Sequence, residues 1–144
     1  MNNPPKARGR VWFRLTALLL GFGILIWLPV EDQSELGVLI ASGAICTWIA
    51  ARLLITAPQE DRQLILRHAL VGSGAGLLLA PMAIILMAVK SGIHGHGTPD
   101  FSVGQIQSVL LRIPYFVLSG FLISLGVGIW RLVRRNEFEA EDEE

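Results

Sequence analysis

One uninterrupted apolar segment, residues 70–90, constrains this chain more than any other feature of its sequence. The segment reads LVGSGAGLLLAPMAIILMAVK and carries no charged residue before Lys90. A helix needs about 20 apolar residues to cross the roughly 30 Å hydrocarbon core of a bilayer. The sequence therefore predicts a membrane-spanning helix here.

The composition extends this prediction to the whole chain. The 144 residues are 52% hydrophobic and 17% charged, whereas about 25% of the residues in an average soluble domain are charged. The single cysteine, Cys46, cannot form a disulfide within the chain and gives no evidence about the redox compartment. No segment is long and polar enough for a separate soluble domain, so we expect one membrane-embedded domain over residues 1–144.

Apolar segments of spanning length occur four times along the chain. A five-residue link, EDQSE, joins the first two segments, and a link this short returns the next helix antiparallel. We predict an all-α integral membrane protein whose four transmembrane helices form two antiparallel hairpins in a four-helix bundle. The predicted spans are 12–30, 36–55, 67–90 and 107–133, with a basic, disordered tail at 1–10 and an acidic tail at 136–144.

Helix-end signals refine two of these spans. Pro58 suits the first turn of a helix, so the third helix is predicted to run from near Pro58 to Lys90 with a kink at Pro81. Ser102 and Gln105 have the spacing of a capping box, which predicts that the fourth helix begins at residue 103. Pro114 should bend this helix where it enters the membrane.

The distribution of basic residues predicts the orientation. Two of the twelve Lys and Arg residues, Lys90 and Arg112, lie at one end of the predicted helices. Basic residues near spans stay on the cytoplasmic side, so we expect both termini in the cytoplasm and the loop 91–101 outside. The other ten lie at the predicted cytoplasmic end: Lys6, Arg8, Arg10, Arg14, Arg52, Arg62, Arg67, Arg131, Arg134 and Arg135.

Small residues recur every four positions in the predicted spans. Helices in lipid associate by close packing, which small side chains permit. We predict helix packing through the stripes of the third and fourth spans, and less use of the stripes in the first two. The predicted packing residues are Gly72, Gly76, Ala80, Gly120, Ser124 and Gly128, and the weaker stripes contain Ala17, Gly21, Gly43, Thr47 and Ala51.

The predicted outward loop contains the clearest group of candidate ligands. His94, His96 and Asp100 are residue types that bind a divalent metal such as zinc. A structural zinc site usually needs four ligands, and three glycines between residues 91 and 101 raise the entropy cost of ordering the loop. A solvated polar loop is the simpler interpretation, and docking to another protein is the use that this loop favours.

The remaining ionisable residues exclude several functions. Haem held between helices takes axial histidines, but His68 has no second histidine within a span, so it is interpreted as an interfacial residue and no cofactor is expected. The span cores lack Asp, Glu and Lys, which disfavours a proton-coupled transporter. Arg112, on the outer side, could pair with Asp100 or with lipid phosphate.

Other classes lack their motifs. The glycines of segment 72–76 resemble a phosphate-binding loop, but no Lys-Ser/Thr follows and no strand precedes, so nucleotide binding is not expected. The chain also lacks the motifs of common hydrolases and redox proteins. The basic ends suit anionic lipid headgroups better than nucleic acid.

These observations favour a non-enzymatic, multi-pass accessory, assembly or structural subunit. Its expected partners are membrane lipids and other membrane protein chains or copies of itself, in a cytoplasmic, inner or equivalent energy-converting membrane. The alternative is a membrane metal or redox protein, or an enzyme, that uses His94, His96 and Asp100. A third interpretation is a small transporter or a pore formed by oligomerisation.

Overall fold

The computed structural model describes the backbone of residues 5–30, 34–55, 61–94 and 100–141, and the side chains of most of these residues. The described residues form five helices and no strand, which confirms the predicted all-α class. The helices are α1 (Pro5–Trp27), α2 (Glu35–Ile55), α3 (Asp61–His94), α4 (Val103–Leu111) and α5 (Ile113–Glu141).

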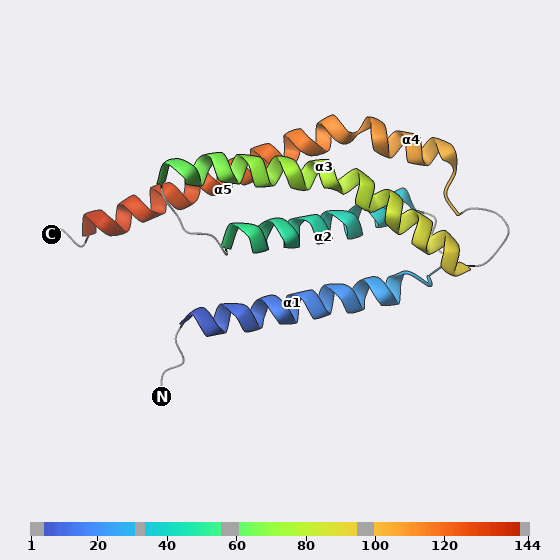
Figure 1. The fold of residues 1–144 in the computed structure, drawn as a ribbon, viewed down its shortest axis with the longest axis horizontal. Coiled ribbons are helices and arrows are strands. Elements are labelled where there is room, and N and C mark those ends of the chain that lie inside the picture. Colours follow the sequence, from blue (N-terminus) through green and yellow to red (C-terminus); the bar gives the residue numbers. More distant parts are fainter. Residues whose placement is uncertain (1–4, 31–33, 56–60, 95–99, 142–144) are drawn as a thin grey trace.

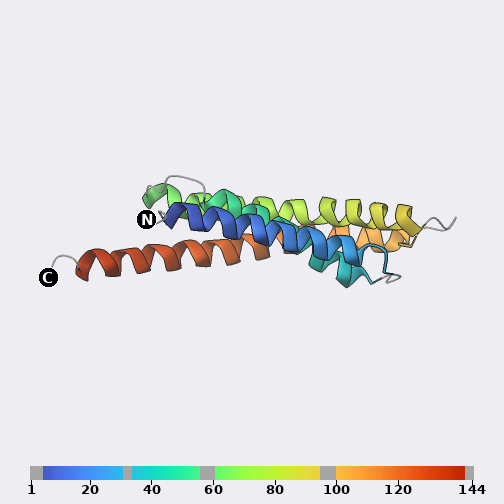
Figure 2. The same ribbon diagram turned by 90° about the horizontal axis from the view of Figure 1, so that it is seen from below.

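The long helices lie along a common direction and alternate in sense. α1, α2 and α3 run in successively opposite directions, and α4 and α5 return together antiparallel to α3 (Figure 1). The view from below shows the same elongated arrangement, with both ends of the chain at one end of the molecule (Figure 2). Short links between consecutive helices produce this alternation.

α3 is the central helix. It packs along α5 on one side and α2 on the other, while α1 contacts the rest of the chain mainly through α2. A buried apolar cluster joins α2, α3, α4 and the segment before α4, at the end of the molecule where α3 finishes. Its members are Val38, Ala80, Ala83, Leu86, Met87, Phe101 and Val109.

α3 extends further at its C-terminal end than the sequence predicts. The helix continues past Lys90 to His94, so the first residues of the predicted loop 91–101 are helical. The predicted start at Pro58 falls outside the described residues. Pro81 lies within the helix, and α3 changes direction along its length (Figure 1).

The predicted span 107–133 is divided into two helices at Arg112. The Ser102 side chain and the Gln105 side chain bond reciprocally to each other's backbone N–H groups, which confirms the capping box at the start of α4. Pro114 has no N–H to continue the ladder to the Leu110 carbonyl. The Arg112 N–H instead bonds to the Val109 carbonyl at 3.2 Å, and α5 begins at Ile113.

Both predicted tails are shorter than expected. α1 begins at Pro5, inside the segment for which the sequence predicts a disordered tail. A proline in the first helical turn has the backbone angle that a helix needs, and the Lys, Ala and Arg that follow are good helix formers. α5 extends to Glu141, within the predicted acidic tail.

Three helices of the described chain are long and apolar enough to cross a membrane: α2, α3 from Gln63 to Ile93, and α5 from Ile113 to Arg134. The apolar part of α1, Val11–Trp27, is shorter. All three long helices expose large apolar side chains, such as Leu36, Leu77 and Ile123. This surface suits a lipid environment and supports a membrane protein.

Candidate functional site

Lys90 is the most unusual residue in the described structure. It lies four residues before the end of α3 and is fully buried, with 0% of its surface exposed. Its Nζ atom lies 4.0 Å from the centroid of the Trp27 ring at the end of α1. No described residue accepts a hydrogen bond from this ammonium group, so the cation–π contact is its main polar interaction.

The sequence predicts that Lys90 lies on the loop side of a span, whereas the structure places it inside the protein. The signal that could have identified its burial is spacing. Ala80, Ala83, Met87 and Lys90 follow one another at intervals of three or four residues and all are buried, as expected for one face of a helix. A buried ionisable group in a span commonly marks a functional position.

A hydrogen bond closes the loop that follows α3. The Asp100 backbone N–H donates to Ser91 Oγ at 3.2 Å, and both Asp100 and Phe101 are buried. This bond ties Asp100, after the loop, to the last turn of α3, next to Lys90 in the sequence.

Only one of the three predicted metal ligands can be placed. Asp100 is buried at the base of the loop, while the His94 side chain and all of His96 lie outside the described residues. Among the side chains that the structure does describe, no three His, Cys, Asp or Glu residues gather around a point. The metal site remains a hypothesis of the sequence.

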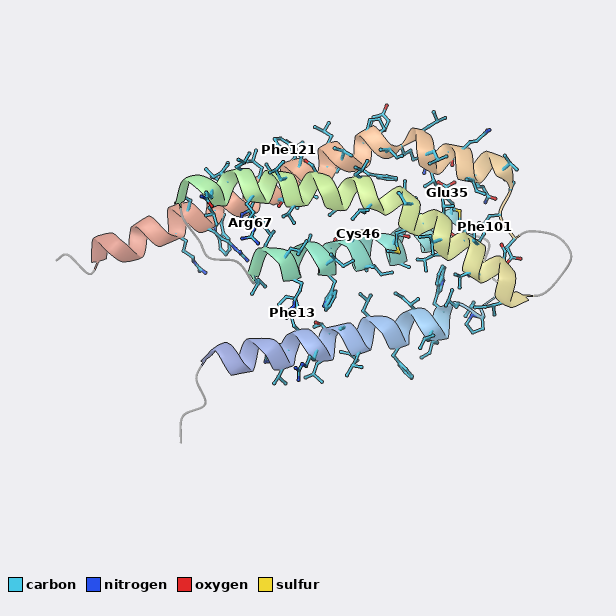
Figure 3. All side chains as sticks on the ribbon, viewed as in Figure 1. Phe13, Glu35, Cys46, Arg67, Phe101 and Phe121 are labelled. Carbon is cyan, nitrogen blue, oxygen red and sulfur yellow. The ribbon has the colours of Figure 1, made fainter. Side chains whose placement is uncertain are left out.

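Arg112 pairs with Glu35 and not with Asp100, which corrects one of the two sequence-based alternatives. Arg112 Nη1 lies 2.5 Å from Glu35 Oε1, and Ser108 Oγ donates to Glu35 Oε2 at 3.0 Å. Figure 3 shows Glu35 and Phe101 at the same end of the molecule. This cluster ties the start of α2 to the end of α4.

α3 and α5 approach closely through glycine. A Cβ atom at Gly72 would overlap the carbonyl oxygen of Gly120 and the Ser124 side chain. A Cβ atom at Gly76 would overlap the Phe116 carbonyl. The structure therefore places these predicted packing residues against the facing helix of the same chain.

The other two predicted packing residues also lie in buried positions. Ala80 is fully buried in the apolar cluster. Gly128 lies against His68, since a Cβ at Gly128 would be 3.1 Å from the His68 Cβ.

His68, which the sequence indicates as a residue near the membrane interface, lies on α3 and is buried against α5. Only 1% of its surface is exposed. Its Nδ1 lies 2.8 Å from the Leu64 carbonyl, and because a carbonyl only accepts, Nδ1 carries the proton. Nε2, like the Oγ of Ser124, is buried without a hydrogen-bond partner in the described part of the chain.

α1 is held near its midpoint and at its last residue. Near the midpoint, Phe13 lies against the Trp48 ring, and Trp48 Nε1 donates to Thr16 Oγ1 at 3.3 Å. Figure 3 shows Phe13 on α1, which lies beside α2. At the end of α1, Trp27 covers Lys90.

The part of α1 between these two contacts has open positions on more than one side. No atom of a neighbouring element lies within 4 Å of a Cβ built at Gly21 or Gly23. Leu18 and Phe22 are also exposed. Gly21 belongs to one of the weaker stripes predicted from the sequence, and its own Cβ position has no close neighbour within the described chain.

No protein family, curated protein or solved structure matches this chain. Its function is therefore inferred from its own residues.

Proposed function

We propose that this chain is a non-enzymatic accessory, assembly or structural subunit of a membrane, and that α1 contacts another membrane protein chain. The observation that carries the proposal is the open position of Gly21 on α1, which has no atom within 4 Å of a Cβ built there. Helices in lipid associate where small residues let backbones approach. The stripes of α3 and α5 are occupied inside the chain, whereas the side of α1 that bears Gly21 is open.

The proposal includes four membrane spans. The apolar part of α1, Val11–Trp27, has 17 residues, which is the lower limit for a span of about 17–25 residues. Its exposed leucines and phenylalanine favour lipid over water. With four spans and most basic residues at one end, both termini lie in the cytoplasm.

The partner of α1 is of a definite kind. The exposed surface of α1 is apolar and helical, so the partner is an integral membrane chain in a cytoplasmic, inner or equivalent energy-converting membrane. A second copy of this chain could occupy the same side of α1. The outward loop, anchored at Ser91 and Asp100, is a further contact at the other end of the molecule.

The test is the composition of the tagged protein after extraction in a mild detergent. We expect reproducible partner chains with the wild type and their loss with Gly21→Leu, because a leucine prevents close helix approach. Gly126→Leu is a matched control, since Gly126 also has nothing within 4 Å of its Cβ position but lies on α5.

Two results would count against the proposal. One is a homogeneous species of a single copy of this chain. The other is equal loss of partners in both variants, which would indicate that bulk on any exposed helix face disturbs the complex. Helix content and monodispersity of each variant show whether the fold is retained.

A further inference from the structure

A groove crosses the molecule between α2 and α5. It has a volume of about 250 Å³. Gly72 and Ala75 of α3 line it between the two flanking helices. The walls are Thr47, Ala50, Ala51 and Leu54 from α2, and Gly120, Ile123, Ser124, Val127 and Arg131 from α5.

The groove changes character along its length. Most of its lining is aliphatic or glycine, and Arg131 lies at one end, opposite Leu54 near the end of α2. This is the end of the molecule at which both termini lie (Figure 1). An apolar channel that finishes at a guanidinium matches a molecule with a hydrocarbon chain and an anionic head.

Arg131 is the arginine available to such a head. Arg134, one turn further along α5, lies over the Trp130 ring with its Cζ 4.9 Å from the ring centroid. Arg67 donates to the Leu53 carbonyl at 2.6 Å. Arg131 forms no ion pair with any carboxylate that the structure describes, and its side chain lines the groove.

We propose that this groove binds one acyl chain of an anionic phospholipid, with the phosphate on Arg131. The inference rests on the proposed membrane insertion but not on the proposed subunit role. Pockets for drug-sized ligands have volumes of about 300–1,000 Å³, so this smaller groove has room for part of one acyl chain and not for a whole lipid. Basic pockets between transmembrane helices on the cytoplasmic side recognise anionic lipid headgroups.

Lipid retention by the purified full-length chain tests the site. The protein is exchanged into detergent containing phosphatidylglycerol or phosphatidylcholine, and bound lipid is counted by native mass spectrometry. We expect the wild type to retain one phosphatidylglycerol in preference to phosphatidylcholine. Arg131→Gln should weaken this retention about tenfold, as expected for loss of a charge-assisted contact.

Two further variants separate the groove from general surface charge. Arg134→Gln removes the same charge from the same helix but leaves the groove lining intact, and it should retain the lipid. Ala51→Phe fills the groove without changing charge, and it should release the lipid. If Ala51→Phe does not fold, as judged by helix content and monodispersity, the comparison of the two arginine variants decides.

Three results would overturn the proposal. They are no retained lipid in the wild type, equal retention of the two lipids, or equal loss in Arg131→Gln and Arg134→Gln. Displacement of the lipid by inorganic phosphate alone would also overturn it, because the acyl chain would then contribute nothing. None of these results depends on whether partner chains co-purify, so failure here is distinguishable from failure of the subunit role.

Discussion

At the scale of single residues, glycines determine how closely α3 and α5 can pack, because a glycine carries only a hydrogen atom where other residues carry a side chain. Gly72 and Gly76 lie against the backbone of α5, where even a methyl group has no space. Gly74, on the same helix, has nothing within 4 Å of its Cβ position. The same residue type therefore has opposite consequences at neighbouring positions.

Substitution of these glycines should separate the two environments. Gly76→Ala pushes a Cβ into the Phe116 carbonyl and should destabilise the protein by about 1–3 kcal/mol, the usual cost of overpacking. Gly74→Ala should leave stability unchanged or raise it by up to about 1 kcal/mol, because alanine favours helix. Thermal unfolding in one detergent measures both, and equal effects would contradict the close packing.

The buried ammonium of Lys90 gives a second prediction at this scale. Trp27→Leu removes the ring that covers Nζ and leaves a buried charge with no described hydrogen-bond partner, so it should destabilise by about 2 kcal/mol. Lys90→Met keeps the length of the side chain without the charge and should cost less. The double variant should be more stable than Trp27→Leu, and additive effects would show that the two residues are not coupled.

At the scale of elements, α4 is a short helix that depends on its first turn. It has nine residues, fewer than the roughly 12–15 at which an isolated helix is marginal. The capping box at Ser102 and the ion pair of Arg112 with Glu35 fix its two ends. The Arg112 side chain is 49% exposed, so this ion pair contributes little and the cap contributes more.

Loss of the cap should therefore loosen α4 locally. Ser102→Ala removes the acceptor of the Gln105 N–H, a loss worth about 1 kcal/mol. Hydrogen exchange of the first amides of α4 should accelerate about fivefold, with α3 unaffected. Gln107→Ala, at an exposed position in the same helix, should change little. Similar exchange in both variants would mean that tertiary packing, not the cap, holds α4.

Local chemistry explains what could be predicted at this scale. The length of the apolar segments predicts the long helices, and the spacing of Ser102 and Gln105 predicts the start of α4. From the sequence, Pro114 predicts only a bend in one continuous helix, whereas the structure has a break at Arg112. Pro114 has no N–H to bond to the Leu110 carbonyl, so its effect appears before the proline itself.

Long-range contacts could not be predicted in the same way. The pairing of Arg112 with Glu35 joins residues far apart in the chain. The burial of Lys90 depends on Trp27 lying beside it in space. The groove depends on α2 and α5 both flanking α3. The His96 hypothesis lies outside the described residues, so the structure adds nothing to it.

At the scale of the whole molecule, the number of spans determines the orientation. Three described helices are long and apolar enough to cross a membrane, and α1 is shorter. Three spans would place the two ends of the chain on opposite sides of the membrane. Four spans place them on the same side, in keeping with the antiparallel helices (Figure 1) and with the basic residues of the sequence near both termini.

The compartment of each terminus is therefore the most direct test. A reporter that is active only in the cytoplasm is fused before Met1 in one form of the protein and after Glu144 in another. We expect activity in both fusions, because the proposed four-span topology has α1 crossing the membrane and both ends in the cytoplasm. Activity at one end only would contradict four spans and would place α1 outside the bilayer core.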